Sequence, residues 1–362
     1  MIQKLQTFVV RIVAGANIAT ILLMLLIGYS DRLNPVSYPL LSTFGLGFPI
    51  FMLLNLGFLL FWVVFKFRWV VIPVAGFIIC FGPIRTYMPL NFKSEPPADA
   101  IKMMTWNVWT LQGWEDKSQP NPVYEYIARQ NADIVCLQEA HPKYIKQEYI
   151  DERLSAIYPY MASSDSKKNR DLLVLLSKYP IIKQEEIAYE SNANHSTAFY
   201  IKMGTDTVLV VNNHLESIRL TIDDRNNFSE MVKGDMESDS ARQQSKLIIH
   251  KLSKANVKRA PEADAVAEYA SQHAQYRTIL CGDFNDGPIS YAHHRFTHQL
   301  QDCFIESGRG LGFTFHHYAM HVRIDHIFAS HHWTPYACYV DSKVKLSDHY
   351  PVISWLQKSP KP

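Results

Sequence analysis

A long uncharged segment near the N-terminus constrains this chain more than any other feature. The run Tyr38–Phe65 contains no Asp, Glu, Lys or Arg, and it exceeds the roughly 20 apolar residues that a helix needs to cross a bilayer. Two shorter uncharged runs, Ile12–Ile27 and Trp69–Ile84, lie on either side of it. We therefore expect about three transmembrane helices within residues 1–93, although the two shorter runs are also compatible with buried helices of a soluble protein.

Basic residues near the ends of these runs predict an orientation. Lys4, Arg11 and the turn Lys66-Phe67-Arg68 share one side of a three-span arrangement. Cytoplasmic ends of spans carry an excess of Lys and Arg, which places this side in the cytoplasm. A smaller opposing group consists of Arg32, Arg85 and Lys93. The sequence thus predicts a multi-pass protein of the plasma (inner) membrane whose C-terminal part is extracytoplasmic.

Proline and charge mark a boundary after the apolar part. The stretch Ser94-Glu95-Pro96-Pro97-Ala98-Asp99 cannot continue a helix, so we expect residues 94–99 to be a linker. The soluble domain is expected at residues 100–358, a length that one domain can have. All 15 histidines lie beyond residue 98, together with 29 basic and 32 acidic residues. This part shows no basic stripe of the kind that binds duplex nucleic acid.

Apolar runs of strand length predict an α/β fold for the soluble domain. Because these runs are apolar on both faces, the sheets that they form must be covered on both faces. The expected strands are Ala100–Trp106, Ile134–Leu137, Leu172–Leu176, Ala198–Met203, Val208–Val211 and Thr278–Gly282. Gly204-Thr205-Asp206 predicts a hairpin turn, and Tyr124–Gln130 has helical character.

The segment from His214 to Thr278 is the longest without a strand pattern. Its apolar spacing predicts two helices, Ala241–Lys254 and Pro261–His273, the second with a proline in its first turn. The stretch Leu220–Ser240 is charged and poor in apolar residues. We expect it to form either a mobile loop near the site or an ordinary surface loop.

Polar residues with catalytic potential follow the last of these strands. The motif Gly282-Asp283-Phe284-Asn285 begins with the last residue of the expected strand Thr278–Gly282. Asp283 and Asn285 are two residues apart, so on an extended backbone their side chains point the same way. Such a pair can hold and deprotonate one water molecule, and Gly282 lets a ligand approach the main chain. Taken alone, the motif is equally compatible with an Asx-rich turn.

Other residues of the same chemical type recur along the soluble part. They are Asn107, Glu139, His214, Asp325, Asp348 and His349. Oxygen ligands and imidazoles without a thiolate suit Mg²⁺ or Mn²⁺ better than zinc or copper. A hard cation beside imidazoles and a water-activating carboxylate is typical of phosphoester hydrolysis.

Three histidine pairs raise zinc as an alternative metal. They are His293-His294, His316-His317 and His331-His332. Adjacent residues of a strand point to opposite faces, which does not favour binding one ion. We therefore expect each pair at the surface or in a loop.

Six motifs, in order along the chain, resemble those of the endonuclease/exonuclease/phosphatase superfamily. They are Thr105-Trp106-Asn107, Cys136-Leu137-Gln138-Glu139, Asn213-His214-Leu215, Gly282-Asp283-Phe284-Asn285, Arg323-Ile324-Asp325-His326 and Ser347-Asp348-His349. The resemblance covers about residues 100–356 and leaves the membrane part unexplained. It implies a four-layer αββα sandwich, with two sheets face to face, helices outside, and a site at one edge of the sheets.

The resemblance implies a metal site, and the sequence departs from the family pattern in two features. Glu139 is the expected principal ligand of Mg²⁺, or of Mn²⁺, with Asn107 and Asp348 near it. Nuclease-like members often carry another acidic residue that supports the first histidine, and a glycine ahead of the third strand. Asn169-Arg170-Asp171 occupies this region here, and neither feature is evident.

The resemblance also implies how the reaction is divided among the other residues. Asp283 is expected to take the proton from the attacking water, and Asn285 to position water and phosphate. His214 and His349 are expected to contact the phosphate, with Asp325 orienting His349 as a carboxylate–imidazole pair.

A membrane anchor restricts the substrate to molecules near the bilayer or in the compartment that the domain faces. We expect a phosphodiester, first a lipid head group and second an extracytoplasmic nucleic acid, ahead of soluble phosphomonoesters. The alternative is a membrane-anchored binding module that retained the fold without catalysis. No protein partner can be inferred from the sequence.

Overall fold

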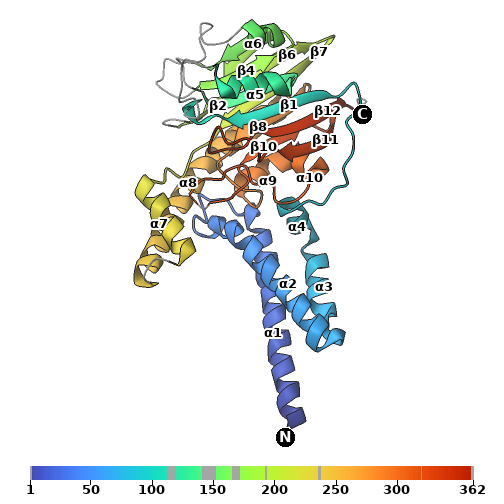
Figure 1. Ribbon diagram of the computed structural model, residues 1–362, viewed down its shortest axis with the longest axis vertical. Coiled ribbons are helices and arrows are strands. Elements are labelled where there is room, and N and C mark those ends of the chain that lie inside the picture. Colours follow the sequence, from blue (N-terminus) through green and yellow to red (C-terminus); the bar gives the residue numbers. More distant parts are fainter. Residues whose placement is uncertain are drawn as a thin grey trace.

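A computed structural model describes residues 2–111, 120–140, 152–164, 172–191, 194–234, 238–318 and 320–359. Figure 1 shows a bundle of helices projecting like a stalk from a layered α/β domain. The helices of this stalk are α1 (Ile2–Gly28), α2 (Phe48–Phe65), α3 (Val71–Ile79) and α4 (Phe81–Tyr87). The N-terminus and the α2–α3 turn lie at the same end of the stalk, opposite the α/β domain (Figure 1). The basic residues near the N-terminus and those in the α2–α3 turn therefore share one end of the stalk (Figure 1), as the three-span prediction requires.

The stalk contains two helical stretches that are long and apolar enough to cross a membrane, Gln3–Arg32 and Leu41–Phe65. The helices α3 and α4 are bent by 64° where they meet, and they make a third span only if the bent pair is one broken span. Cys80 lies at this bend, and Pro83 follows it in the first turn of α4. Because Pro83 has no backbone N–H to donate, α3 does not continue straight into α4. The structure thus supports two or three spans, against the expected three.

A small polar network holds the stalk together. The Nδ2 atom of Asn17 donates to Asn55 Oδ1 at 3.0 Å, and Trp62 Nε1 donates to Asn17 Oδ1 at 3.2 Å. Asn55 in turn donates to the carbonyl of Pro73 at 3.0 Å. Polar side chains inside an apolar bundle are stable only when paired in this way. Asn17 and Asn55 therefore make contacts between helices.

Two six-stranded sheets form the α/β domain. In spatial order, the first sheet contains β11 (Trp333–Val340), β12 (Val352–Lys358), β1 (Ile101–Asn107), β2 (Ile134–Ala140), β4 (Leu172–Ser177) and β3 (Tyr160–Ser163). The second contains β5 (Ile181–Glu186), β6 (His195–Met203), β7 (Asp206–His214), β8 (Arg277–Asp283), β10 (Asp325–Ala329) and β9 (Gln301–Asp302). All the strands expected from apolar runs are present, and β6 and β7 form the expected hairpin.

Helices cover the outer face of each sheet and complete four layers. The first sheet packs against α5 (Pro122–Gln130) and α6 (Glu152–Ile157), and the second against α8 (Ser238–Gln272) and α9 (Tyr291–Thr297) (Figure 1). A separate apolar core fills the space between the sheets. A short helix, α10 (Cys303–Ser307), follows β9. The expected αββα sandwich is confirmed.

The segment between β7 and β8 differs from the prediction. Instead of a loop over Leu220–Ser240, the chain forms helix α7 (Ile222–Lys233), which begins with a capping box between Thr221 and Asp224. Such a box satisfies two free N–H groups, and it stabilises a helix that has few apolar residues. The prediction of a loop is therefore wrong.

The two helices expected after α7 are one continuous helix, α8, with Pro261 in its interior. Proline removes one backbone hydrogen bond, which usually ends or kinks a helix. Here the following turns are fully packed, since Ala263 and Val266 are completely buried against the second sheet. Burial of this face offsets the lost hydrogen bond, so the helix continues.

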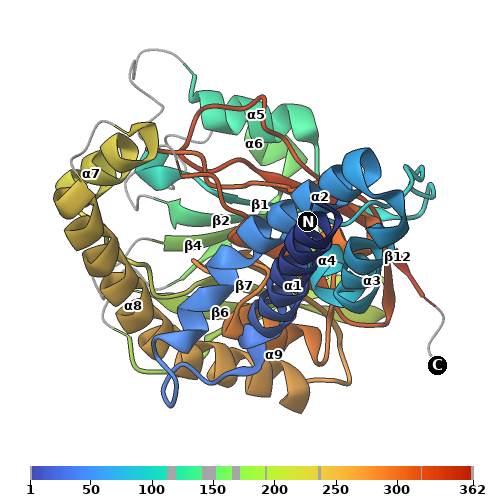
Figure 2. The same cartoon turned by 90° about the horizontal axis from the view of Figure 1, so that it is seen from below.

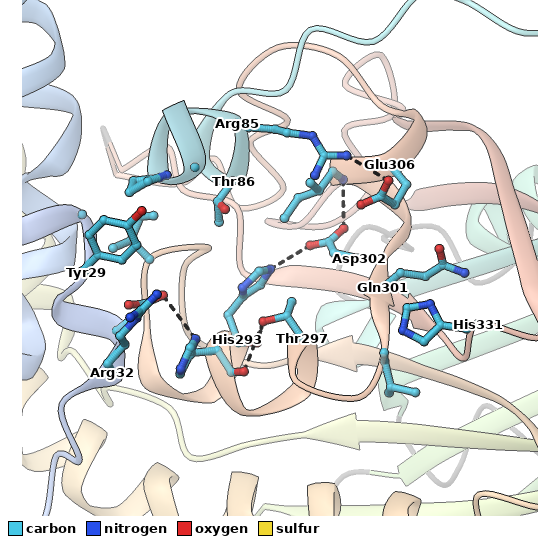
Figure 3. A pocket seen from close by; sticks show the side chains of 18 residues that line it. Tyr29, Arg32, Arg85, Thr86, His293, Thr297, Gln301, Asp302, Glu306 and His331 are labelled. Atoms are coloured by element: carbon cyan, nitrogen blue, oxygen red, sulfur yellow. Dashed lines mark hydrogen bonds and ion pairs between the residues drawn. The ribbon is translucent and has the colours of Figure 1, made fainter. Parts of the chain in front are cut away.

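Specific contacts fix the α/β domain on the stalk. Asn91 Nδ2 donates to the carbonyls of Ile305 at 2.9 Å and Gly308 at 2.8 Å, and Arg323 donates to the carbonyl of Thr86 at 2.6 Å. A cavity of about 460 Å³ lies at the junction, with Tyr29 on the stalk side (Figure 3). Seen from below in Figure 2, the stalk covers only part of the domain, and α7 and α8 lie beside it. The domain therefore has one defined orientation relative to the apolar helices.

Candidate active site

Strand pairing brings four of the predicted residues to one edge of the sheets. The pairs β1/β2 and β7/β8 are parallel, so the C-terminal ends of each pair meet at the same edge. Asn107 is the last residue of β1, and Glu139 lies one residue before the end of β2. His214 and Asp283 end β7 and β8 and are paired in the parallel register. The sheet topology thus collects polar side chains that are far apart in the sequence.

Asn107 connects the two sheets at this edge. Its Nδ2 atom donates to Glu139 Oε1 and to Asp283 Oδ2, both at 2.9 Å, and its Oδ1 atom accepts from the N–H of Trp109 at 3.0 Å. His214 Nε2 lies 3.7 Å from Glu139 Oε1 and 3.9 Å from Asp283 Oδ2. One ligand atom each from Glu139, His214 and Asp283 lies within 4.8 Å of the others. This spacing is short enough for one ion to bridge them.

Irregular backbone conformations at Glu139 and Gly282 shape the site. Glu139 has a φ of 50°, and the pairing of β2 with β4 shifts register between Leu137 and Ala140. The resulting bulge turns Glu139 out of the regular strand. Gly282 has a φ of 132°, and a Cβ there would meet the carbonyl oxygen of Asn213 at 2.0 Å. Only glycine permits this close approach of β7 and β8 directly beside the site.

Asp283 and Asn285 are linked to each other. The N–H of Asn285 donates to Asp283 Oδ1 at 2.8 Å, and Asn285 Nδ2 donates to the carbonyl of Leu215 at 3.0 Å. Asn285 has a φ of 50°. This is an Asx-type turn, and it lies within the polar cluster. The structure therefore shows the Asx-type turn, and the catalytic interpretation of the motif stays a prediction.

His349 also lies near Asp283, and it is oriented by a buried carboxylate. Its Nδ1 atom is 2.8 Å from Asp325 Oδ2, and its Nε2 atom is 3.7 Å from Asp283 Oδ2. Burial lowers the pKa of His349, but the charges of Asp325 and Asp283 outweigh this effect and raise the pKa to about 10. Thr314 Oγ1 accepts from the N–H of Asp325 at 3.1 Å. His349 is thus a cation at neutral pH, able to donate to an anion.

Asp348 adds another carboxylate to the cluster. Burial raises the pKa of Asp348, and so do the charges of Glu139 and Asp283, whereas His349 and Arg225 oppose them, giving a pKa of about 6. These carboxylates repel one another, and a divalent cation relieves such repulsion. The donor set of this edge therefore fits a hard metal ion.

A buried amide network beneath the site was not predicted from the sequence. Gln138 Nε2 donates to Thr105 Oγ1 at 2.9 Å and to Asn212 Oδ1 at 2.7 Å. Asn212 Nδ2 reaches the carbonyl of Leu137 at 3.0 Å. These bonds join the two sheets directly below Glu139 and His214. In the sequence, the only sign of this network was that two amide side chains, Gln138 and Asn212, each follow an apolar run.

An aromatic and basic group at the rim of the site was also missed. Trp109 lies next to His317, with ring centroids 5.4 Å apart, and His317 lies 4.1 Å from Tyr318. The guanidinium of Arg225, on α7, lies over the ring of Tyr318 at 5.6 Å. The backbone N–H of His316 donates to the carbonyl of Asp348 at 3.1 Å, which ties this group to the cluster. The sequence offered no periodic signal for it.

Arg170 and Asp171, where the sequence departs from the family pattern, lie outside the described residues.

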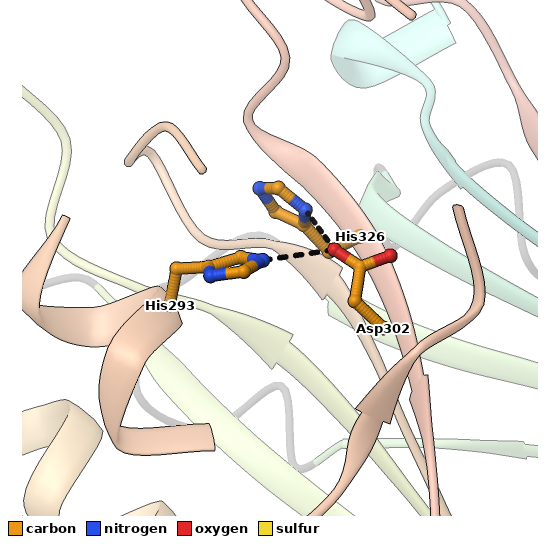
Figure 4. A group of neighbouring side chains, drawn as sticks. All are labelled: His293, Asp302 and His326. Carbon is orange, nitrogen blue, oxygen red and sulfur yellow. Dashed lines mark hydrogen bonds and ion pairs between the residues drawn. The ribbon is translucent and has the colours of Figure 1, made fainter. Parts of the chain in front are cut away.

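His293 departs from the expected surface placement. It is 4% exposed in α9, and its Nε2 atom is 2.9 Å from Asp302 Oδ2. His326 Nδ1 lies 3.4 Å from the same oxygen (Figure 4). Burial lowers the pKa of His293 to about 4, despite the opposing charge of Asp302. The buried guanidinium of Arg323 interacts with Asp302 and supplies the positive charge of this group. This cluster is therefore a charge-balanced part of the domain interior, apart from the active-site edge.

Comparison with known proteins identifies the fold and the family. The Endonuclease/Exonuclease/phosphatase family matches residues 104–349, and a family described as a domain of unknown function (DUF8431) matches residues 10–87. No curated protein matches the chain. The span from residue 104 to residue 349 contains all six motifs.

Solved structures are similar to this chain at low sequence identity. A humanized D. rerio TDP2 has 16% identity and a TM-score of 0.50, covering 72% of this chain and 100% of that one. A functionally unknown protein from Enterococcus faecalis V583 has 17% identity and a TM-score of 0.49, with the same coverage of 72% and 100%. An endonuclease/exonuclease/phosphatase from Bacteroides vulgatus has 17% identity and a TM-score of 0.48, covering 72% and 99%. With the family match extending over residues 104–349, the chain belongs to the endonuclease/exonuclease/phosphatase family of metal-dependent phosphoric ester hydrolases.

Proposed function

We propose that this protein is a membrane-anchored hydrolase that cleaves phosphodiesters by metal-assisted attack of water. The observation that carries the proposal is the meeting of Glu139, His214, Asp283 and His349 at one edge of the sandwich. Carboxylates for a cation and a base, beside imidazoles for phosphoryl oxygens, are the groups that this reaction needs. A serine or cysteine nucleophile is not required.

Glu139 and Asp348 are the proposed ligands of Mg²⁺, with Mn²⁺ as the alternative. When bound, the cation would polarise a phosphoryl oxygen and neutralise charge that develops on it. Asn107 was also expected to be a ligand, but its oxygen accepts from Trp109 and its N–H groups face the carboxylates. Binding metal through Asn107 requires its amide to turn. In the observed geometry Asn107 instead holds Glu139 and Asp283 at a fixed separation.

The remaining residues have distinct proposed roles in the chemistry. Asp283 takes the proton from the attacking water, and Asn285 keeps the carboxylate in place through its N–H. His214 and His349, whose Nε2 atoms both lie near Asp283 Oδ2, donate to phosphoryl oxygens. Asp325 acts through His349, since it contacts that ring directly. This division of labour uses positioned donors and one general base.

The proposed substrate follows from the position of the domain. Residues 1–93 form the proposed membrane region of a plasma (inner) membrane protein, 94–99 the linker and 100–358 the catalytic domain. The domain rests on the apolar helices through defined contacts, which include the bonds of Asn91 and Arg323. A phosphodiester of a lipid head group is therefore the first candidate substrate, and an extracytoplasmic nucleic acid the second.

Glu139→Gln tests both the metal and the reaction. The glutamine retains an oxygen for Asn107 but removes the negative charge. Because changes outside the ligand shell already cost about 10–100-fold in metal affinity, we expect half-saturation to need at least ~100-fold more Mg²⁺. The assay uses a panel of phosphodiester and phosphomonoester substrates, and a substrate-free readout is the rise in Tm that Mg²⁺ causes. Glu268→Gln, on the exposed side of α8, is the matched control. Unchanged metal dependence in Glu139→Gln would remove Glu139 from the site.

Orientation is tested with reporters. We expect alkaline phosphatase fused after Pro362 to be active, because that enzyme requires the extracytoplasmic side. A green fluorescent protein fused after Lys66 should fluoresce, since the basic turn is on the cytoplasmic side. A C-terminal fusion that works only with the cytoplasmic reporter would reverse the proposed topology.

A further inference from the structure

Helix α7 is fastened to the domain on one side. Asp224 is buried and accepts from the N–H of Thr221 at 2.7 Å, and it also pairs with Lys251 of α8. Met231 of α7 accepts from Ser245 of α8 at 3.1 Å. These contacts fix which face of α7 is turned away from α8.

A different face of α7 carries exposed apolar side chains and one arginine. Ile222, Arg225, Ser229 and Val232 are spaced by three or four residues, so they share this face. Ile222 is 67% exposed and Val232 is 57% exposed. More than half of each of these two side chains is exposed, so both are available for an apolar contact with another molecule.

The same face reaches the catalytic edge through Arg225. Its guanidinium lies over the ring of Tyr318 at 5.6 Å, and the neighbouring His317 contacts Trp109. Trp109 is bonded through its N–H to Asn107 of the site. Arg225 therefore projects from α7 toward the rim of the active site, and it is a cation beside the place where a phosphodiester binds.

Helix α7 lies at the level where the stalk meets the α/β domain (Figure 1). In Figure 1, α7 hangs below the sheets, at the level of the domain-proximal ends of α1 and α2. Seen from below in Figure 2, it is set off to the side of those helices. Asn256 of α8 donates to Ser42 Oγ at 3.2 Å, which links the hairpin of α7 and α8 to the segment leading into α2. If the stalk crosses a bilayer, α7 is held beside the bilayer surface.

We infer that α7 is the recognition element for a membrane phospholipid, with Arg225 taking an anionic oxygen of the phosphodiester and Ile222 and Val232 resting among the acyl chains. The inference rests on the proposed function and names its substrate class. Burial of exposed Ile and Val side chains in lipid is favourable by the hydrophobic effect, and a guanidinium matches a phosphodiester by charge and hydrogen bonding. A nucleic-acid strand offers no apolar surface of this kind to Ile222 and Val232.

The first experiment compares substrates with the full chain reconstituted in bilayers. Hydrolysis of phosphatidylglycerol in vesicles with phosphatidylcholine is measured against hydrolysis of soluble bis(p-nitrophenyl) phosphate. In the double variant Ile222→Ser/Val232→Ser, the ratio of lipid to soluble rates should fall on the order of tenfold or more, from the lost burial. Ile182→Ser is the matched control, because Ile182 is 57% exposed on β5, at the far edge of the second sheet. An unchanged ratio in the double variant overturns the inference.

Arg225 is tested in the same assay. Arg225→Gln should raise KM for the vesicle substrate on the order of tenfold, as expected for the loss of a charge-assisted hydrogen bond. Arg225→Lys should restore part of this loss, because it returns the charge but not the planar fork. A preference of the wild-type protein for single-stranded oligonucleotides over lipid, with Ile222→Ser/Val232→Ser unaffected, overturns the assignment to phospholipid.

A second measurement does not depend on catalysis. The five native cysteines are buried, so a Val232→Cys variant can be labelled selectively with bimane. Nitroxide-labelled phospholipid in the surrounding bilayer should quench this label and leave a label at Ile182→Cys unquenched. Absence of quenching at position 232 overturns the inference whatever the activity. Quenching together with no hydrolysis of any phosphoester leaves α7 at the membrane and refutes the proposed function instead.

Discussion

Asp283→Asn should reduce the rate of phosphodiester hydrolysis by about 10²–10⁴-fold, the usual cost of removing a general base. Asparagine has the same shape and can still accept from the N–H of Asn285, but it cannot take a proton from water. Asp283 is 1% exposed and lies within reach of Asn107, His214 and His349. The measurement is kcat under saturating Mg²⁺.

The control for this variant is Asp264→Asn, which removes a half-exposed carboxylate between α8 and α9. It should leave kcat unchanged. Circular dichroism and the Tm of both variants show whether the fold persists, since Asn107 then faces an amide where it faced a carboxylate oxygen. If Asp283→Asn kept more than about a tenth of the wild-type rate, Asp283 would not be the general base.

His349→Ala should lower kcat by about 10²–10³-fold, because it removes a cationic donor aimed at the phosphoryl group. Asp325→Asn retains both groups that face the substrate but loses the carboxylate that orients and charges the imidazole. The two residues act as one unit in this geometry, with His349 Nδ1 2.8 Å from Asp325 Oδ2. Most of the effect of Asp325→Asn should therefore disappear in a His349→Ala background.

The double-mutant cycle has a pH readout that a purely structural role of Asp325 does not produce. Burial lowers the pKa of His349, and the charges of Asp325 and Asp283 raise it to about 10. A pKa raised on folding stabilises the protein below the unfolded value near 6.5, and this stabilisation is lost as pH rises through about 10. Asp325→Asn should thus move the loss of the imidazolium to lower pH, as followed by NMR of the His349 ring. If the rate loss of the double variant equalled the product of the two single losses, Asp325 would not act through His349.

The strands and most site residues were predictable because their signals are local. A buried strand reads as an apolar run, and Asp283, Glu139 and His214 stand where such runs end. The six ordered motifs then indicated the family, which the match over residues 104–349 confirms. Topology alone explains why distant strand ends become one site, since parallel neighbours end at a common edge.

The segment between β7 and β8 was predicted poorly because its stability is not local. Helix α7 has few apolar residues, and it depends on the bond of Asp224 to Lys251 in another helix. Pro261 lies inside α8 because the adjacent face is buried against the sheet. His293 is buried because α9 packs where Asp302 can accept from it. Each of these contacts is made between different elements of the fold, which no local pattern of the sequence predicts.

The sequence by itself determined an apolar N-terminal part, an α/β fold and the identity of the polar residues at the strand ends, because each depends on the periodicity or composition of neighbouring residues. The four-layer sandwich was implied by the resemblance of the six motifs to the family. Only the tertiary structure decided that Asn107 bridges Glu139 and Asp283, that Arg225 of α7 reaches the rim of the site, and that the domain is held in one orientation on the stalk. These features depend on contacts between segments far apart in the chain. Their geometry is set by how sheets and helices pack, and no local pattern carries that information.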